Sequence, residues 1–268
     1  MNQHLFDRAI ALDTLAPGRC AGRTDPAWAN MVGPFGGVTA ATALQAILLH
    51  PDRLGEPVAL TVNFCAALAD GAFEVEAQAV RTNRSTQHWA VSIEQAGETV
   101  LTATALTATR RETWGAQEVR APQVLSPAGL GRPQLPAAVE WVKRYDMRFA
   151  EGPIPRVWDG EGENSRTVLW VRDEPPRALD FTSLTALCDV FYPRVWRRRA
   201  TRVPAGTVSM TVYFHAGSAE LAAVGDGWLI GQAESSALRN GYFDQRAHLW
   251  SQAGVLLATT HQVVYYKE

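Results

Sequence analysis

The sequence predicts an α+β protein made of two similar units, in each of which a central helix packs on a curved antiparallel sheet. Three observations support this class. The 268 residues suffice for two domains of about 130 residues each. Short segments of the first half return in the second, and both halves predict one helix followed by four strands. With 47% hydrophobic residues, the chain can fill a substantial core.

The internal repeat consists of two short segments that return in the same order, apart from small gaps. Thr61–Phe64 returns as Thr211–Phe214, and Gln95–Thr104 returns as Gln252–Thr260. Chance matches among Ala, Thr and Val are common, so the repeat gains its weight from the secondary structure that repeats with it.

The first half predicts a helix and then four antiparallel strands. Gly36-Gly37 opens an Ala-rich helical stretch from Val38 to Leu49, which Pro51 ends. Alternating apolar residues, separated by turns such as Asp70-Gly71, then predict strands at 60–64, 73–79, 89–93 and 100–109.

The second half predicts the same order after two leading strands, Val142–Phe149 and Arg166–Arg172. The segment from Phe181 to Arg199 contains a helical stretch, and Pro193 should kink it or end its first part. Strands follow at 208–214, 228–236, 241–251 and 255–266. Because 112–136 is rich in Pro and Gly, we expect a first unit at 1–111, a linker at 112–137 and a second unit at 138–268.

Composition excludes several function classes. A formal charge of −2 gives no positive field for nucleic acid. The longest charge-free stretch, 27–49, is too polar for a membrane span, and the N-terminus does not resemble a secretory signal. The three cysteines, Cys20, Cys65 and Cys188, lie far apart and are odd in number, which favours neither a disulfide framework nor a metal site. We therefore expect reduced thiols in the cytoplasm.

Other enzyme classes lack their motifs. The six histidines show no HExxH or other metal-binding spacing. The chain has no GxSxG turn of a serine hydrolase, and Gly129–Gly131 lacks the strand and helix that a dinucleotide site requires.

Three polar residues remain as candidates for chemistry. Asp189 is the one carboxylate within the otherwise uncharged segment Leu184–Phe191. It either faces solvent or serves a site with polar partners. Thr207 begins a strand, where strict alternation places its hydroxyl on the same face as Ser209. Gln262 has small and apolar neighbours on its face of the last strand.

Collinear motifs give the chain a resemblance to acyl-CoA thioesterases of the thioesterase II type, which are double-hotdog proteins. The matching segments, in family order over nearly the whole length, are Phe35–Gly37, Arg81–Asn83, Thr102–Ala105, Tyr145–Arg148, Val168–Arg172, Tyr213–His215 and Gly254–Gln262. The resemblance implies an acyl-CoA substrate, a role in lipid metabolism and a homo-oligomer.

The resemblance also implies a mechanism and its residues. In that family an Asp on the second helix, a Thr on the following strand and a Gln on the last strand position the attacking water. By motif position these residues are Asp189, Thr207 and Gln262. A carboxylate can take the proton of water while hydroxyl and amide groups orient it, so the reaction needs neither a metal nor a cofactor.

The first repeat is expected to be catalytically silent. The repeat alignment puts Leu106 at the position of Gln262, and the helix 38–49 contains no carboxylate. Gly36-Gly37 is expected to permit close backbone packing rather than to touch a ligand.

The run Arg194–Arg202, with five arginines, is either a solvated helix end or a site for the phosphates of coenzyme A. The alternatives to hydrolysis are a hydratase or dehydratase, which would need a paired Asp and His, and a non-catalytic acyl-binding protein.

Overall fold

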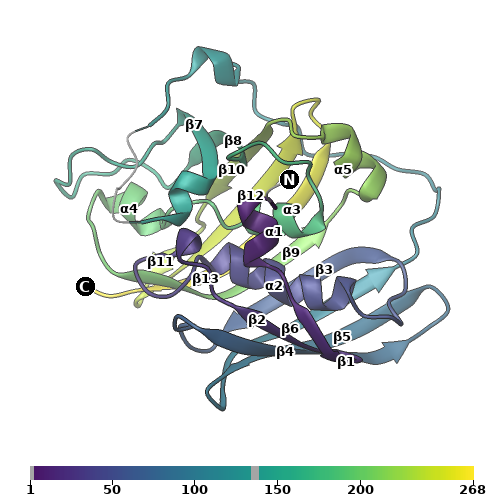
Figure 1. Cartoon of the computed structure of the whole chain (residues 1–268). Coiled ribbons are helices and arrows are strands. Elements are labelled where there is room, and N and C mark those ends of the chain that lie inside the picture. Colours follow the sequence, from purple (N-terminus) through teal and green to yellow (C-terminus); the bar gives the residue numbers. More distant parts are fainter. Residues whose placement is uncertain (1–2, 134–138) are drawn as a thin grey trace.

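The computed structural model describes residues 3–133 and 139–268, which form one long curved antiparallel sheet wrapped around helices (Figure 1). Its strands are β1 (Asp13–Ala16), β2 (Arg19–Arg23), β3 (Glu56–Phe64), β4 (Ala72–Thr82), β5 (Thr86–Gln95), β6 (Glu98–Ala108), β7 (Tyr145–Glu151), β8 (Thr167–Asp173), β9 (Ala205–Phe214), β10 (Leu229–Glu234), β11 (Leu238–Arg239), β12 (Tyr242–Ser251) and β13 (Leu256–Tyr266). The helices are α1 (Leu5–Ala9), η1 (Pro26–Trp28), α2 (Gly36–Leu48), η2 (Pro127–Gly129), η3 (Trp141–Arg144), α3 (Phe181–Leu187), α4 (Arg194–Arg199) and α5 (Ser218–Val224).

The strand order consists of two matching halves that meet at the β3–β9 pair. The first half runs β1–β2–β4–β5–β6–β3 and the second runs β9–β13–β12–β10–β8–β7, with β11 paired to β12. Thr61 lies directly opposite Thr211, its counterpart in the sequence repeat, and their hydroxyl oxygens are 3.0 Å apart. The internal repeat therefore reappears as an approximate twofold relation centred on this pair.

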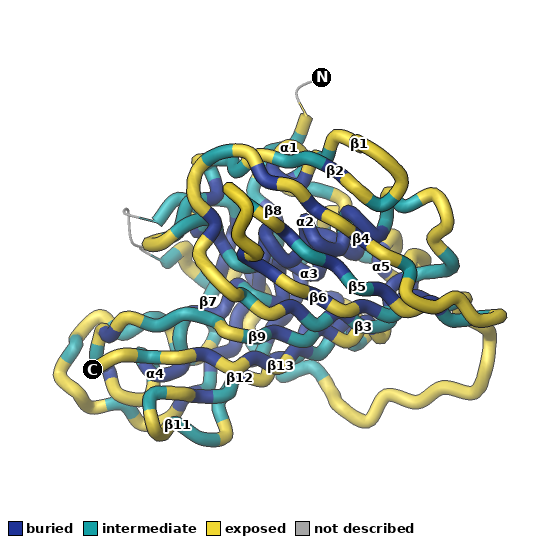
Figure 2. Tube along the Cα trace, turned by 90° about the horizontal axis from the view of Figure 1, so that it is seen from below, coloured by how far each residue is buried: buried dark blue, intermediate teal, exposed yellow. Residues whose placement is uncertain are grey.

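Alternation along the strands sends one row of side chains to the helices and the other to solvent. In β4, Phe73 and Val75 are buried while Glu74 and Glu76 are exposed (Figure 2). The turn between β5 and β6 places Ala96 and Gly97 at φ values of 53° and 83°, the two left-handed positions that a tight hairpin requires.

The inner face of the sheet packs against α2 and α3, which also contact each other. Gly37 allows this approach, because a Cβ there would lie 2.7 Å from the carbonyl oxygen of Ala186 and 2.5 Å from the Phe35 ring. Among the described residues, no helix combines the length and the apolar character needed to cross a bilayer.

The interruption expected at Pro193 within the predicted helical stretch Phe181–Arg199 is confirmed, but the first helix ends earlier than predicted. α3 ends at Leu187, and Pro193 caps a separate six-residue helix, α4. Proline disfavours the helical conformation of the residue before it and cannot donate a backbone hydrogen bond, so Pro193 explains why no helix continues through Tyr192 into α4. At the other end, Asp180 caps α3 by accepting a hydrogen bond of 2.8 Å from the Ser183 backbone.

The sequence did not predict β1 and β2, which are short and lack a clear alternation of buried residues. They occupy the places in the first half that β7 and β8 occupy in the second. Between β6 and residue 133, η2 is the regular element that the structure describes. The predicted boundary at 137/138 lies outside the described residues, and the division into units 1–111 and 138–268 stays a prediction.

The tight contact at Gly37 gives a stability prediction. Gly37→Ala adds a methyl group between α2 and the α3 backbone, and we expect it to lower the free energy of unfolding by about 1–3 kcal/mol despite the higher helix propensity of Ala. Gly115→Ala is the control, because no atom lies within 4 Å of a Cβ there. Denaturant unfolding checks both, and equal midpoints for the two variants would contradict the packing argument.

Candidate active site

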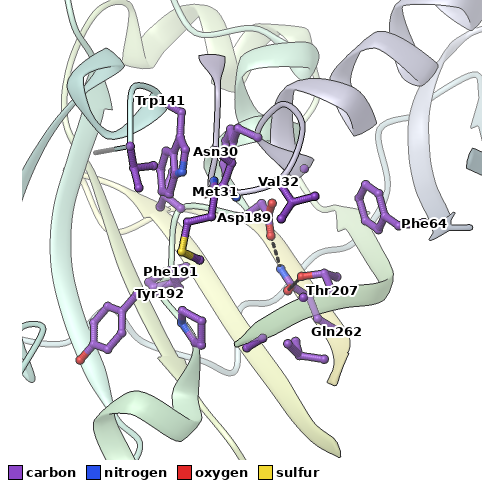
Figure 3. Close-up of a pocket in the computed structure, with 18 of the residues that line it drawn as sticks. Asn30, Met31, Val32, Phe64, Trp141, Asp189, Phe191, Tyr192, Thr207 and Gln262 are labelled. Atoms are coloured by element: carbon purple, nitrogen blue, oxygen red, sulfur yellow. Dashed lines mark hydrogen bonds between the residues drawn. The ribbon is translucent and has the colours of Figure 1, made fainter. Parts of the chain in front are cut away.

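A cavity of about 550 Å³ lies between the two halves of the chain. The first half contributes Met31 and Val32 from the loop before α2, and Phe64 from the end of β3 (Figure 3). The second half contributes aromatic side chains that include Phe191 and Tyr192. These walls are largely apolar, so the cavity suits a hydrocarbon group.

Asp189, Thr207 and Gln262 come together in the wall of this cavity. The Thr207 hydroxyl donates to Gln262 Oε1 over 3.2 Å, and Gln262 Nε2 donates to Asp189 Oδ1 over 2.9 Å (Figure 3). Gln262 is 2% exposed, whereas Asp189 and Thr207 are partly exposed and line the cavity. Of the two interpretations of Asp189, the one that places it in bulk solvent is therefore wrong.

The predicted orientation of Thr207 is also wrong, and a β-bulge explains why. Val263 pairs with Ser209, but the next residue, Val264, pairs with Thr207, so Val208 is an extra residue in β9. One extra residue moves the following side chains to the opposite face of a strand. Thr207 consequently points inward to Gln262 rather than outward with Ser209.

The N-terminus of α2 lies against the Asp189 carboxylate. The backbone N–H of Gly37 lies near the Asp189 carboxyl and lowers its pKa, and a Cβ on Gly36 would approach Asp189 Oδ2 to 2.9 Å. Gly37 therefore packs as expected, whereas Gly36 lines the cavity and keeps the space beside Oδ2 open. The expectation that Gly36 and Gly37 permit close packing rather than touch a ligand stays a prediction for Gly36, which lies at the cavity wall.

Desolvation raises the pKa of Asp189 from 3.8 to about 7, against the smaller lowering by the Gln262 and Gly37 hydrogen bonds. A carboxylate with a pKa near neutral pH can accept a proton from water and release it again. The amide of Gln262 occupies Oδ1, which leaves Oδ2 beside Gly36 for such a water.

The first half lacks these polar groups at the matching positions. Leu60 pairs with Ala105 and its counterpart Met210 pairs with Gln262, so Ala105, not Leu106, matches Gln262. The alignment of the two repeats from sequence alone is therefore one residue out of register with the strand pairing. An apolar side chain occupies the position in either alignment.

The arginine run Arg194–Arg202 divides into side chains with different surroundings. Arg194 is fully buried and donates to the carbonyl oxygens of Tyr192 and Ser165, so it is not part of a solvated helix end. Arg202 is exposed, lines the cavity and lies over the Trp158 ring at 4.7 Å. Of Arg194 and Arg202, only Arg202 has a guanidinium group that is accessible to a phosphate of a bound molecule.

No sequence pattern indicated that the loop at Met31 and Val32 forms a wall of the cavity. Gln245, which is buried and lines the cavity next to Gln262, was also not predicted. The strand pattern could have indicated Gln245, because Phe243, Gln245 and Ala247 share one face of β12. An amide is unusual between buried apolar residues.

Comparison with known proteins identifies the relatives of this chain. Residues 24–108 match the family model of the acyl-CoA thioesterase N-terminal domain, and residues 118–266 match that of the C-terminal domain. Among proteins with curated functions, none matched the chain.

Solved structures show a similar fold over the whole chain. A protein of unknown function with a hotdog fold from Alicyclobacillus acidocaldarius is 45% identical, with a TM-score of 0.94 over 100% of this chain and 99% of that one. An acyl-CoA thioesterase II from Mycobacterium marinum is 17% identical, with a TM-score of 0.77 over 98% of each chain. The TesB protein of Mycobacterium avium subspecies paratuberculosis is 17% identical, with a TM-score of 0.79 over 98% of each chain. The chain therefore has the hotdog fold.

The raised pKa of Asp189 predicts a pH-dependent stability. The folded protein holds this proton more tightly than the unfolded chain, so ionisation lowers stability as pH rises from about 4 through about 7. Asp189→Asn removes the titration, and we expect the stability of the variant relative to wild type to increase by about 1–3 kcal/mol between pH 4 and pH 8.

Denaturant unfolding of both proteins at several pH values measures this difference. Asp173, whose pKa burial raises to about 6, is present in both proteins, so its titration cancels in the comparison. A difference that stays constant from pH 4 to pH 8 would show that Asp189 has an ordinary pKa.

Proposed function

We propose that this chain, which belongs to the acyl-CoA thioesterase family, hydrolyses the thioester bond of an acyl-CoA to give a free acid and coenzyme A. The observation that carries the proposal is the hydrogen-bonded chain Thr207–Gln262–Asp189 at the wall of an apolar cavity. We propose further that the two halves of the sheet are the two repeats of a double hotdog, of which only the second supplies a catalytic site.

In this mechanism, Asp189 takes a proton from a water molecule held at Oδ2. The resulting hydroxide bonds to the thioester carbon, and collapse of the tetrahedral intermediate breaks the carbon–sulfur bond. The departing thiolate takes up the proton that Asp189 accepted, which restores the carboxylate. Gln262 and Thr207 fix the carboxylate in one orientation. The positive end of α2 lies beside the carboxylate, where it would favour the negative charge that develops on the thioester oxygen.

The cavity walls suit the acyl group of such a substrate. Apolar side chains from both halves, among them Val32, Phe64 and Phe191, would remove a hydrocarbon chain from water. None of the described residues that line the cavity is a histidine. The Asp and His pair that a hydratase or dehydratase would use is therefore missing at this site.

Amino-acid substitutions at the site test the proposal. Asp189→Asn keeps the shape of the side chain but removes the base, so we expect kcat for acyl-CoA hydrolysis to fall by about 10²–10⁴-fold with KM little changed. Thr207→Val and Gln262→Leu should lower kcat less, because each group only orients others. Release of free thiol from acyl-CoAs of different chain lengths measures these rates.

The control variant is Gln87→Leu, which removes a buried amide from the first half, away from the cavity. It should lose stability but keep kcat. Full activity of Asp189→Asn would remove the assigned base, and binding of acyl-CoA without any thiol release by wild type would indicate a non-catalytic acyl-binding protein.

A further inference from the structure

The cavity carries one cationic side chain, Arg202, that the proposed mechanism does not use. Among the described residues that line the cavity, Arg202 is the only cation and Asp189 the only anion. Its neighbour in the arginine run, Arg199, forms an ion pair with Glu268 outside the cavity. In the part of the chain that the structure describes, Arg202 forms no such pair, although it is exposed and lies at the cavity wall. An otherwise uncharged cavity thus presents a single positive charge to whatever it binds.

Two tryptophans hold the Arg202 side chain in place. Its guanidinium lies over the Trp158 ring at 4.7 Å. Trp158 meets Trp196 edge-on, with ring centroids 6.0 Å apart, and the Trp196 indole N–H donates to the Val203 carbonyl oxygen over 2.7 Å. Stacking of this kind uses the flat face of a guanidinium, whereas its N–H donors point outward from the edge. Arg202 is therefore oriented in advance for an acceptor with several oxygens.

The distance between Arg202 and the proposed catalytic groups suits the arm of coenzyme A. Arg202 precedes Thr207 by five residues, which span at most about 17 Å when fully extended. Ala205 and Gly206, which lie between them in the sequence, also line the cavity. The pantetheine chain, from sulfur to phosphorus, has about as many bonds as four residues of backbone, so its reach is similar. A thioester placed beside Asp189 can therefore bring its pyrophosphate to Arg202.

The first half carries the opposite charge at the matching position. β3 and β9 have a bulge at the same place, so their residues correspond one to one when counted back from the paired Thr61 and Thr211. The same count gives Asp52 as the counterpart of Arg202. A carboxylate at this position would repel a phosphate. The cation is thus found in the half that carries Asp189.

We propose that Arg202 is a substrate-binding residue that holds the pyrophosphate of coenzyme A. The inference rests on the proposed thioesterase function and names the group that recognises the departing part of the substrate. The planar fork of a guanidinium matches two oxygens of a phosphate, so the contact selects thioesters of coenzyme A over equally long thioesters without phosphates. The pyrophosphate keeps this contact before and during hydrolysis, so loss of Arg202 should raise KM and leave kcat unchanged.

Substrates that differ only in their phosphates test the inference. Wild type and Arg202→Met are assayed by thiol release with acyl-CoA, acyl-3′-dephospho-CoA and acyl-pantetheine of one chain length. We expect wild type to favour both coenzyme A thioesters over acyl-pantetheine by about tenfold or more in kcat/KM. Arg202→Met should lose most of that preference through a higher KM, with kcat/KM for acyl-pantetheine unchanged. Arg199→Met, which removes an exposed arginine outside the cavity, should keep the preference.

Three results would overturn the inference. The first is equal kcat/KM of wild type for acyl-CoA and acyl-pantetheine, and the second is an equal loss on both substrates in Arg202→Met. The third is a wild type that loses its preference with acyl-3′-dephospho-CoA, because recognition would then lie at the ribose phosphate and not at the pyrophosphate. If Arg202→Met does not fold, Arg202→Gln replaces it with the same expectation.

If wild type hydrolyses none of these thioesters, the proposed function has failed, and calorimetry with non-hydrolysable alkyl thioethers of coenzyme A and of pantetheine tests Arg202 separately. Tighter binding of the coenzyme A thioether, lost in Arg202→Met, would support the role of Arg202. Equal binding of both thioethers would refute it.

Discussion

The contact between the start of α2 and the C-terminal end of α3, where Ala186 and Asp189 lie, determines the geometry of the site. Gly37 packs on the carbonyl oxygen of Ala186 in α3. Asp189, two residues beyond the end of α3, lies near the Gly37 N–H. Any side chain at Gly36 would fill the space beside Asp189 Oδ2. The helix of one repeat thus supplies the electrostatic environment for the carboxylate of the other, and neither half could form this site alone.

The sheet provides the second constraint, because its register decides which polar groups reach the carboxylate. The approximate twofold relation centred on Thr61 and Thr211 makes the two halves equivalent in backbone. Their side chains differ: Ala105 and Trp89 lie where the second half has Gln262 and Gln245. Duplicated backbone and divergent side chains explain how one half can carry the chemistry while the other supplies packing and part of the cavity wall.

Much of this arrangement could be predicted from the sequence, and the failures have physical causes. Alternation and turn residues locate the long strands well, because one row of each strand is buried. The site residues Asp189, Thr207 and Gln262 follow from motif position, and the structure brings them together. Their catalytic roles stay a proposal.

Strict alternation placed Thr207 on the wrong face, because the bulge at Val208 leaves no mark in the sequence pattern. The walls at Met31 and Val32 come from a loop that is tied to the second half, where the Glu140 and Trp141 backbone N–H groups donate to the Ala29 carbonyl oxygen. Such tertiary contacts are invisible to local periodicity.

We infer that burial beside the start of α2 makes Asp189 a base for reaction near neutral pH. The pH dependence of kcat/KM for acyl-CoA hydrolysis, measured from pH 5 to pH 9, tests it most directly. With the pKa of Asp189 raised to about 7, kcat/KM should fall about tenfold per pH unit well below 7 and level off above it. A profile that stays flat down to pH 5 would contradict this role of Asp189, because it would mean that the base already ionises at the pKa of an ordinary carboxylate.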